Sequence, residues 1–498
     1  MSASPDDTTP KDTAPDDTAE DSASETGERQ LDEGSVFKAL MVMAGPMIFG
    51  IAAVMSVTMI DTLYVGQLGK EQLAALSFAF PVTTVVSGLA LGLSAAGASL
   101  VSRAIGEDDR EAARTLSLHT LLLGILTTGT VAAIGFLIAE PLFKLIGADE
   151  TTLDYILTYM RIWFLAVPFL TVAMMCDFIV RATGNSVWPS IVMSAGSVFN
   201  ILITGLLVFG VGPFPDMGIE GAATGTLIAQ ILTVVAGIWM VTWKAGLVDW
   251  ALPDLRRMIP SWWDAAKVAV PASFGNMVHP FTLTVITALL ATFGQDTVAA
   301  FGVATQVEVI ATIPLLALSS ALSPIAGQNW GAGKPDRIVR SLKISYWVCV
   351  GWAALVAVPL WMFGDSIAGL FNSDGGIPEE AQTYLRIVPF SLFGYGMVIC
   401  AAAAFNGIDE AKRALGYNIV RSLVLFLPLA WIGARLADKP GVYGGIAAAN
   451  VISGLVIGWY AIRWLNHHCR KVREGDAETC EEAEEDTRDA DGHLVPAE

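Results

Sequence analysis

The sequence has few charged residues and no excess of positive charge. Asp, Glu, Lys and Arg make up 15% of its 498 residues, whereas soluble domains carry about 25%. This scarcity, with 54% hydrophobic residues and a mean hydropathy of +0.57, excludes an ordinary soluble enzyme and a disordered chain. The net charge of −19 argues against nucleic acid as a partner, because phosphate contacts need basic groups. A large polytopic membrane protein remains.

Cysteines and catalytic motifs are also scarce. The five cysteines show no CxxC spacing, which argues against a disulfide framework or a zinc site. The patterns GxxxxGK[ST], HExxH and GxSxG are absent, so we find no ATPase motor and no hydrolase centre. No cleavable signal peptide is visible, because the first apolar run starts near Ala39 behind an acidic segment. We therefore expect neither enzyme activity nor a metal or organic cofactor.

Most of the negative charge lies in the two tails. Residues 1–36 carry a net charge of −9 and residues 466–498 a net charge of −7. Both segments are rich in Asp, Glu, Ser, Thr and Ala and poor in large apolar residues, a composition typical of disorder. We predict disordered acidic tails over residues 1–35 and 466–498.

Long apolar runs fill the chain between the tails. A membrane span needs about 20 mostly apolar residues, and twelve segments meet or approach this length. The sequence therefore predicts an all-α integral membrane protein with twelve transmembrane helices. Ten runs without Asp, Glu, Lys or Arg are 39–60, 72–102, 115–139, 182–215, 221–243, 268–295, 309–333, 344–364, 387–408 and 441–462, and two interrupted or short segments are 155–180 and 414–434.

Basic residues between these segments set the predicted orientation, because cytoplasmic loops are enriched in Lys and Arg. With both termini cytoplasmic, the cytoplasmic loops and the start of the C-terminal tail hold nineteen basic residues, among them Arg421. The opposite loops hold four. We therefore predict a multi-pass protein with both termini in the cytoplasm.

An internal repeat divides the membrane body. At an offset of 225 residues, five features of the first half recur in the second, and near the ends of the halves the offset is 223. Because six is an even number, two six-helix halves share one membrane orientation, and a pseudo-two-fold axis along the membrane normal should relate them. The matches are Pro46 and Pro271, Gly50 and Gly275, Gly69 and Gly294, Gly106 and Gly331, TyrMetArgIle at 159–162 and TyrLeuArgIle at 384–387, and Gly184 and Gly407.

The repeat also gives predicted domain boundaries. The N-lobe covers residues 36–243 with helices 1–6, and the C-lobe covers residues 263–465 with helices 7–12. Residues 244–262 between them are polar and read as a cytoplasmic linker. Parallel six-helix repeats are typical of secondary transporters.

Asp61 is the sharpest candidate for ion coupling. A carboxylate at the bilayer centre costs at least about 2.5–3.5 kcal/mol, and a bound proton or cation would offset this cost. Pro46, fifteen residues earlier, removes a backbone donor and can bend the same helix. The repeat equivalent of Asp61 is Ile286, so the scaffold does not require a charge there. The alternative is an interfacial Asp that caps the outer helix end.

Three polar residues of helices 5 and 6 are candidate partners of Asp61. Asn200 and Thr204 are four residues apart and share one helix face. Thr226 follows the small-residue run GlyAlaAlaThrGly, which allows helices to approach closely. Together with a carboxylate, these oxygens suit a hard cation such as Na+. The alternative is that they only form hydrogen bonds within or between helices.

The second half has its own polar cluster. Gln306 and Glu308 lie in helix 8 and His279 lies in helix 7. We consider them a candidate second site, at which Glu308 would take a proton or a cationic substrate. The alternative is that Glu308 pairs with His279 or faces water.

Several segments of the sequence, in this order, resemble the multidrug and toxic compound extrusion (MATE) family. The resemblance covers about residues 36–465, and GlyGlnAsnTrpGlyAlaGlyLys at 327–334 favours the DinF-like branch, which includes archaeal members. The segments are IDTLYVGQLGKEQLAALSFAFPV at 60–82, SRAIGEDD at 102–109, RATGN at 181–185, SSALSPIAGQNWGAGKPDR at 319–337 and AAAAFNGIDEAKRA at 401–414.

The resemblance implies two six-helix lobes in a V shape and cation-driven efflux with a broad substrate range. It implies that Asp61 is the coupling residue, that Asn200 and Thr226 are its partners, and that Pro46 bends helix 1. The chain departs from archaeal-type members where they carry NxxxD, because Thr204 occupies the Asp position. It also departs from the NorM-like branch, whose helix 7 Glu and helix 10 Asp are replaced by His279 and Tyr395.

Our hypothesis from the sequence is a sodium- or proton-coupled antiporter of the plasma membrane that exports organic, mainly cationic, compounds by alternating access. Its expected partners are small-molecule substrates and the lipid bilayer, and we expect a monomer. The alternative is a flippase for a lipid-linked or polysaccharide precursor. The small number of basic residues in the predicted spans favours the antiporter.

Overall fold

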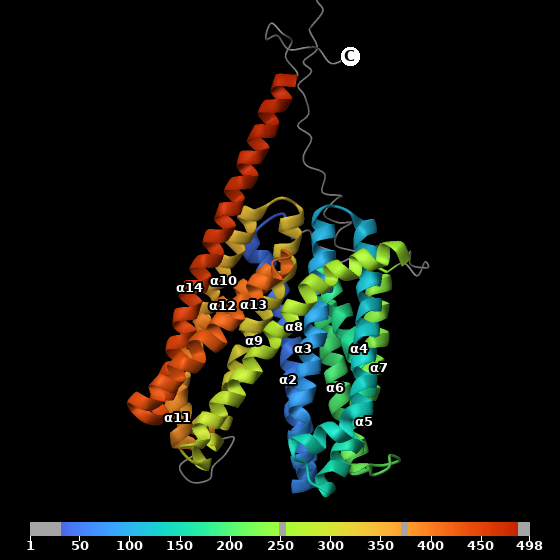
Figure 1. Ribbon diagram of the computed structural model, residues 1–498, viewed down its shortest axis with the longest axis vertical. Coiled ribbons are helices and arrows are strands. Elements are labelled where there is room, and N and C mark those ends of the chain that lie inside the picture. The colour runs from blue at the N-terminus through green and yellow to red at the C-terminus, as the bar shows by residue number, and fades with distance from the viewer. Residues whose placement is uncertain (1–30, 249–254, 370–376, 487–498) are drawn as a thin grey trace, which may run out of the picture.

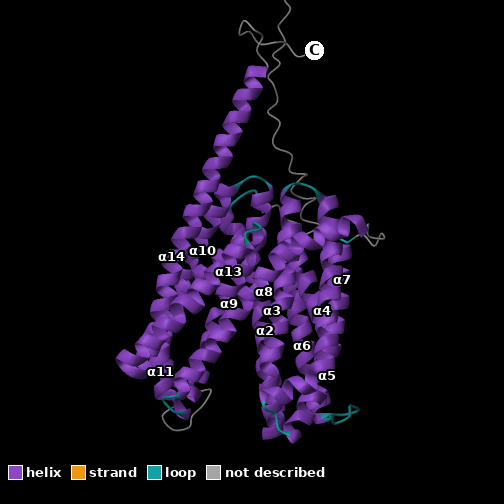
Figure 2. Ribbon diagram, in the orientation of Figure 1, coloured by secondary structure: helices purple, strands orange, loops and turns teal. Residues whose placement is uncertain are grey.

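The computed structural model describes residues 31–248, 255–369 and 377–486, and all its regular elements in this part are helices joined by short loops (Figure 2). Eleven candidate spans among the described residues are long and apolar enough to cross a membrane. Helices suit the apolar composition, because a helix satisfies its backbone N–H and C=O groups internally where no water is available. The observed class is therefore an all-helical, multi-pass membrane protein, as predicted.

The first half of the chain forms one group of helices, which we call the N-bundle (Figure 1). Several of these helices begin at a capping side chain; for example, Asp109 and Asp149 accept hydrogen bonds from the backbone three residues later. The bonds from Thr152 also hold the pKa of the Asp149 carboxyl below its ordinary value. The elements of the N-bundle are α2 (Val36–Leu68), α3 (Lys70–Gly106), α4 (Arg110–Ile146), α5 (Glu150–Ala182), α6 (Val187–Phe209), α7 (Gly218–Trp239) and the π-helical turn η1 (Met240–Lys244).

The second half forms the other group, the C-bundle, on the left in Figure 1. Helix α8 begins beside α4, where Trp262 donates a hydrogen bond to the His119 carbonyl, and then runs into this group. The elements are α8 (Leu255–Ala291), α9 (Gln295–Gly331), α10 (Pro335–Gly369), α11 (Ile377–Ile387), the 3₁₀ turn η2 (Pro389–Ser391), α12 (Leu392–Gly407), α13 (Ala411–Ile419), the π-helical segment η3 (Val420–Phe426) and α14 (Leu427–Asp486).

The last candidate span, Ala411–Arg470, is 60 residues long and is not one straight helix. Two helices meet inside α14, because the backbone of Ala437 and Asp438 is not helical. This break falls between the predicted segments 414–434 and 441–462. The count of eleven candidate spans differs from the predicted twelve because this stretch is counted once.

The two bundles approach closely where α3 and α9 end. A Cβ atom on Gly106 would collide with the Gln328 carbonyl, and one on Gly331 would collide with the Arg103 carbonyl. Gly106 and Gly331 are equivalent in the repeat, and so are Arg103 and Gln328. The two contacts therefore exchange equivalent partners. Only glycine allows the two backbones to lie this close.

Two predicted boundaries differ from the structure. Helix α8 begins at Leu255, inside the segment 244–262 that we predicted as a linker, and residues 249–254 lie outside the described part. Residues 466–486 continue α14, although we predicted disorder there; the stretch contains no proline and is rich in Glu, which favours helices. Predicted tail residues 1–30 and 487–498 lie outside the described residues.

Candidate functional site

Helices α2 and α6 run parallel, and their contacts fix the level of Asp61. Ser186 bonds Val42 and Ser190 bonds Met47, at separations of 144 and 143 residues. Further along, Tyr64 packs against Gly205, a separation of 141 residues. Because two parallel helices rise equally per residue, this register places Asp61 level with Thr204.

Asp61 is half-buried in α2, inside a candidate membrane span. Its Oδ1 atom is buried and has no hydrogen-bond partner among the described residues. Tyr159 of α5 lies within electrostatic range of this carboxylate. A buried carboxylate oxygen without a donor is costly, so a proton or cation at this position would stabilise it.

The predicted partners of Asp61 lie near its level along the membrane normal, on helices α6 and α7. Asn200 and Thr204 are buried on α6, and the Thr204 hydroxyl donates to the Asn200 side-chain oxygen at 3.3 Å. Helix α7 approaches α6 closely here, because Gly225 packs directly against Thr204. Thr226, the next residue, is half-buried and donates to the Ala222 carbonyl at 3.1 Å. We call Asp61, Asn200, Thr204 and Thr226 the N-bundle site.

Pro46 lies inside α2, which continues across it to Leu68. Proline has no N–H, so the carbonyl four residues earlier, that of Val42, loses its helical donor. The Ser186 hydroxyl at the start of α6 donates to this carbonyl at 3.2 Å. Pro46 also lines an apolar groove of about 660 Å³ between α2 and α6, together with Phe49 and Phe199. The predicted bending point of α2 is therefore tied to α6.

The candidate second site is only partly assembled. Glu308 of α9 is half-buried and accepts a short hydrogen bond from the hydroxyl of Tyr384 in α11. Gln306 is exposed. It lies two residues before Glu308, and residues two apart on a helix do not face the same side. His279 of α8 lies beside Tyr395, with ring centroids 5.8 Å apart and ring planes tilted by 32°, and its buried Nδ1 has no partner among the described residues. Glu308 thus pairs with a tyrosine and not with His279.

Arg421 was misplaced by the sequence analysis. We counted it among the cytoplasmic loop residues, but the structure places it in η3 with a relative exposure of 3%. This correction has a simple cause: the run 414–434 is short, and its interior charge resembles a loop boundary. The signal that could have located Arg421 is this same run, because a lone charge within an apolar segment of about 20 residues marks a buried functional group.

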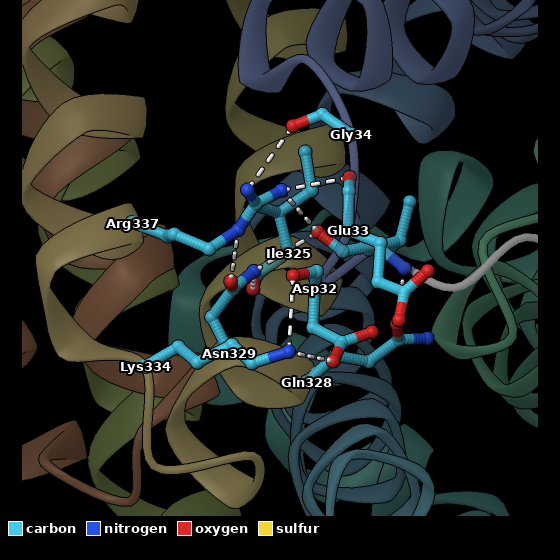
Figure 3. Close-up of polar contacts among 9 residues, drawn as sticks. Asp32, Glu33, Gly34, Ile325, Gln328, Asn329, Lys334 and Arg337 are labelled. Atoms are coloured by element: carbon cyan, nitrogen blue, oxygen red, sulfur yellow. Dashed lines mark hydrogen bonds and ion pairs between the residues drawn. The ribbon is translucent and has the colours of Figure 1, made fainter.

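A second polar cluster joins the bundles just before the start of α2 (Figure 3). The turn at residues 31–34, just before α2, lies against the end of α9 and the start of α10. The guanidinium of Arg337 donates to the carbonyls of Glu33 and Gly34 at 2.8 and 3.1 Å. Lys334 pairs with Asp32 at 2.7 Å. We call this group of contacts the N-terminal clasp.

Gln328 extends the clasp into the N-bundle. Its side chain accepts from the Leu31 N–H at 2.8 Å and donates to the Ala182 carbonyl of α5 at 2.7 Å. Nearby, Arg103 of α3 pairs with Asp409 at 3.3 Å. Polar contacts thus connect the bundles at the end where α3, α5 and α9 terminate.

The comparisons with known proteins agree on one family. The sequence profile of the MatE family matches residues 46–206 and 271–432, one match in each half of the chain. Among curated proteins, the chain is 33% identical over 442 residues to the "FAD transporter" of Shewanella oneidensis, covering 89% of this chain and 97% of that protein. It is 28% identical to the "Probable multidrug resistance protein YpnP" of Bacillus subtilis, covering 81% and 91%.

Solved structures give the same fold. The chain resembles the Vibrio cholerae MATE transporter VcmN in its bent form with a TM-score of 0.80 and 26% identity, covering 91% of this chain and 99% of that one. A point mutant of VcmN matches with a TM-score of 0.81 and 27% identity, covering 89% and 97%.

Proposed function

This chain belongs to the MatE family of multidrug efflux transporters, and on that premise we propose that it is a cation-coupled antiporter that exports organic compounds. Family membership indicates transport and not catalysis. The coupling ion in this proposal is Na+ or a proton, and the protein needs no other cofactor. The exported compounds are small organic molecules, mainly cations.

One observation carries the ion-coupling proposal. Asp61 has a buried Oδ1 atom without a donor among the described residues, inside a membrane span and level with Thr204. With Asn200 and Thr226 at neighbouring positions, the N-bundle site offers carboxylate, amide and hydroxyl oxygens. Such hard oxygen ligands suit Na+, and the carboxylate alone suits a proton.

The proposed cycle starts with cation binding at Asp61 from outside. Neutralising the carboxylate removes its cost in the membrane, and α2 can then repack at Pro46, where Ser186 holds the free carbonyl of Val42. The two states must differ in their affinity for cation and substrate, because otherwise no coupling arises. Each cation that moves down the membrane potential supplies about 2.3 kcal/mol per 100 mV.

We propose that the chain forms twelve spans in two lobes related by a pseudo-two-fold axis, with the break at Ala437 and Asp438 separating helices 11 and 12. The exchanged contacts of Gly106 and Gly331 support this arrangement. Both termini would lie in the cytoplasm, so the N-terminal clasp would close the cytoplasmic side. We propose a monomer in the plasma membrane and place it in the DinF-like branch.

The C-bundle supplies the proposed second coupling or binding position at Glu308. Its short hydrogen bond to Tyr384 supports a role for this carboxylate in proton or cationic-substrate binding. His279 would contribute its Nδ1, which has no hydrogen-bond partner among the described residues. Gln306 is exposed, so it would contact a substrate only outside the cluster of Glu308, Tyr384 and His279.

A second candidate function is transport of an anionic nucleotide. The relative from Shewanella oneidensis, which matches almost end to end, carries the name FAD transporter. The observation that favours this function here is the buried Arg421 in the C-bundle, since a cation in a membrane site suits an anionic ligand.

The test is transport by purified protein in proteoliposomes. A fluorescent organic cation is followed under a sodium gradient at equal pH, and then under a pH gradient without sodium. One gradient should drive transport by the wild type, and the Asp61→Asn variant should lose this response.

Each other outcome contradicts a defined part of the proposal. Transport that persists in Asp61→Asn would exclude the N-bundle site as the coupling site. Absence of cation transport under both gradients would exclude drug export and favour either the nucleotide or a lipid-linked precursor as cargo. Leak without any gradient coupling would indicate a channel.

A further inference from the structure

The centre of the C-bundle contains a buried cation that the coupling proposal does not use. Arg421 lies in the π-helical segment η3 and is 3% exposed. It interacts with side chains of α8, α9, α11, α12 and α14 through a hydrogen bond, a ring contact or electrostatic attraction and repulsion. Segments of π-helix are rare and often occur at functional sites.

The direct neighbours of Arg421 are polar or aromatic and carry no formal charge. Its Nε donates to the side-chain oxygen of Asn450 at 3.2 Å, and Asn450 in turn donates to Ser391 at 3.1 Å. The guanidinium lies 4.4 Å from the ring centroid of Tyr395 and 5.7 Å from that of Phe426. None of the ion pairs among the described residues includes Arg421.

Glu308 is an acidic residue that acts on Arg421 electrostatically, but no hydrogen bond or ion pair between the two is present among the described residues. Its carboxylate is engaged by the hydroxyl of Tyr384, while Arg421 acts on it only through electrostatic attraction at longer range. A structural salt bridge would bring the two groups into contact, as in Arg103 and Asp409. The arrangement therefore leaves the guanidinium only partly compensated.

The chemistry of the guanidinium points to an oxyanion. Arginine carries five N–H donors in a planar fork that matches a carboxylate or a phosphate. Among the described residues, the hydrogen bonds of Arg421 use only Nε, which leaves the terminal nitrogens for a ligand. His279, whose buried Nδ1 has no partner among the described residues, lies beside the same Tyr395 ring. His279 and Tyr395 are both half-buried, so this side of the cluster is partly accessible.

We propose that Arg421, with His279 and Tyr395 beside it, forms an anion subsite in the C-bundle that binds the carboxylate or phosphate group of an acidic organic substrate. The subsite rests on the proposed export function and extends its substrate class from cations to anions. Glu308 opposes the bound anion, so its charge tunes the affinity of the subsite.

Binding of two fluorescent flavins tests this subsite. Riboflavin is uncharged, and flavin mononucleotide is the same ring system with a phosphate. Quenching of flavin fluorescence by the full-length protein in nanodiscs gives both affinities without requiring transport. The wild type should bind the phosphate-bearing flavin about tenfold more tightly, because hydrogen bonds between a guanidinium and a phosphate are stronger than those between neutral groups.

Three variants should move this preference in defined directions. Arg421→Gln should remove it while riboflavin affinity stays within about twofold. Asn450→Asp keeps the shape of the Arg421 partner but adds a negative charge, and should weaken binding of the phosphate-bearing flavin. Glu308→Gln removes the opposing charge and should strengthen it about threefold. Opposite shifts in the last two variants cannot arise from general loss of folding.

Equal affinity of the wild type for the two flavins would overturn the anion subsite. Shifts in the same direction for Asn450→Asp and Glu308→Gln would also overturn it and would assign Arg421 a structural role. The Asp61→Asn variant separates this proposal from the proposed function. It should lose ion-driven transport of the organic cation and keep the preference for the phosphate-bearing flavin.

Discussion

The two bundles share a scaffold but carry different chemistry at their centres. Tyr159 in the N-bundle and Tyr384 in the C-bundle are equivalent in the repeat, and each lies near a membrane carboxylate. The carboxylates are not equivalent: Asp61 comes from α2 and Glu308 from α9, which corresponds to α3. The repeat therefore preserved the position of the tyrosine, while each bundle acquired its acid from a different helix.

The electrostatic balance of the two centres also differs. In the N-bundle site the only charged group is Asp61, with neutral Asn and Thr side chains at the same level, so the proposed ligand there is a cation. The C-bundle contains Arg421 in addition to Glu308, so it can favour an anion. Two halves with one fold can thus divide ion coupling and substrate binding between them.

The largest expected effect on transport distinguishes the carboxylate of Asp61 from that of Glu308. Asp61→Asn should reduce gradient-driven transport of an organic cation at least about 100-fold, because the coupling charge is lost. Glu308→Gln should reduce it only about threefold, because this carboxylate already has a protein donor in Tyr384. Initial rates in proteoliposomes measure both. Similar losses in the two variants would show that the bundles contribute equally to coupling.

The next largest effect concerns the close backbone contacts of Gly106 and Gly331, which are equivalent in the repeat. Gly106→Val and Gly331→Val should each destabilise the protein by about 1–3 kcal/mol, because the new side chain overpacks against a backbone carbonyl. Thermal unfolding in detergent measures this loss. Gly444→Ala is the matched control, since a Cβ there meets no neighbour within 4 Å and the helix should be unharmed. Unequal effects of the two valines would break the proposed pseudo-symmetry.

The N-terminal clasp has no equivalent in the other half, because the repeat partner of Arg337 is Ala112. Arg337→Ala should weaken closure at this end of the bundles about tenfold, since two backbone carbonyls lose a charged donor. Distances between spin labels on α4 and α10 report the population of the separated state. Arg340→Ala, on the same helix but absent from the clasp contacts, is the control. An unchanged distance distribution in Arg337→Ala would contradict a closing role for the clasp.

The smallest effect should come from the equivalent tyrosines. Tyr384→Phe removes the donor to Glu308 and should change transport about two- to threefold, no more than the loss of the Glu308 charge itself. Tyr159→Phe should change it less than about twofold, because Tyr159 acts on Asp61 through electrostatics without a hydrogen bond in the structure. Transport rates for the two variants at saturating gradient provide the comparison. A larger loss in Tyr159→Phe would mean that this hydroxyl contacts Asp61 during the cycle.

Long apolar runs and the repeat predicted the helical membrane class, because both follow from local composition. The same reasoning misjudged residues 466–486, where acidic composition suggested disorder but helix-favouring residues continue α14. It also placed Arg421 in a loop, because a charge in a short apolar run resembles a boundary. Only packing from several helices shows that this charge is buried.

The sequence by itself determined the class of the protein and its internal repeat, and it singled out Asp61 as the candidate coupling residue, because a charge in an apolar run is costly wherever the helix packs. It also placed Asn200 and Thr204 on one face, since helical periodicity is local. Only the tertiary structure decided that the register of α2 and α6 brings Asp61 level with Thr204, and that Tyr384 rather than His279 meets Glu308. Such contacts depend on how distant helices dock, and no local pattern in the chain specifies them.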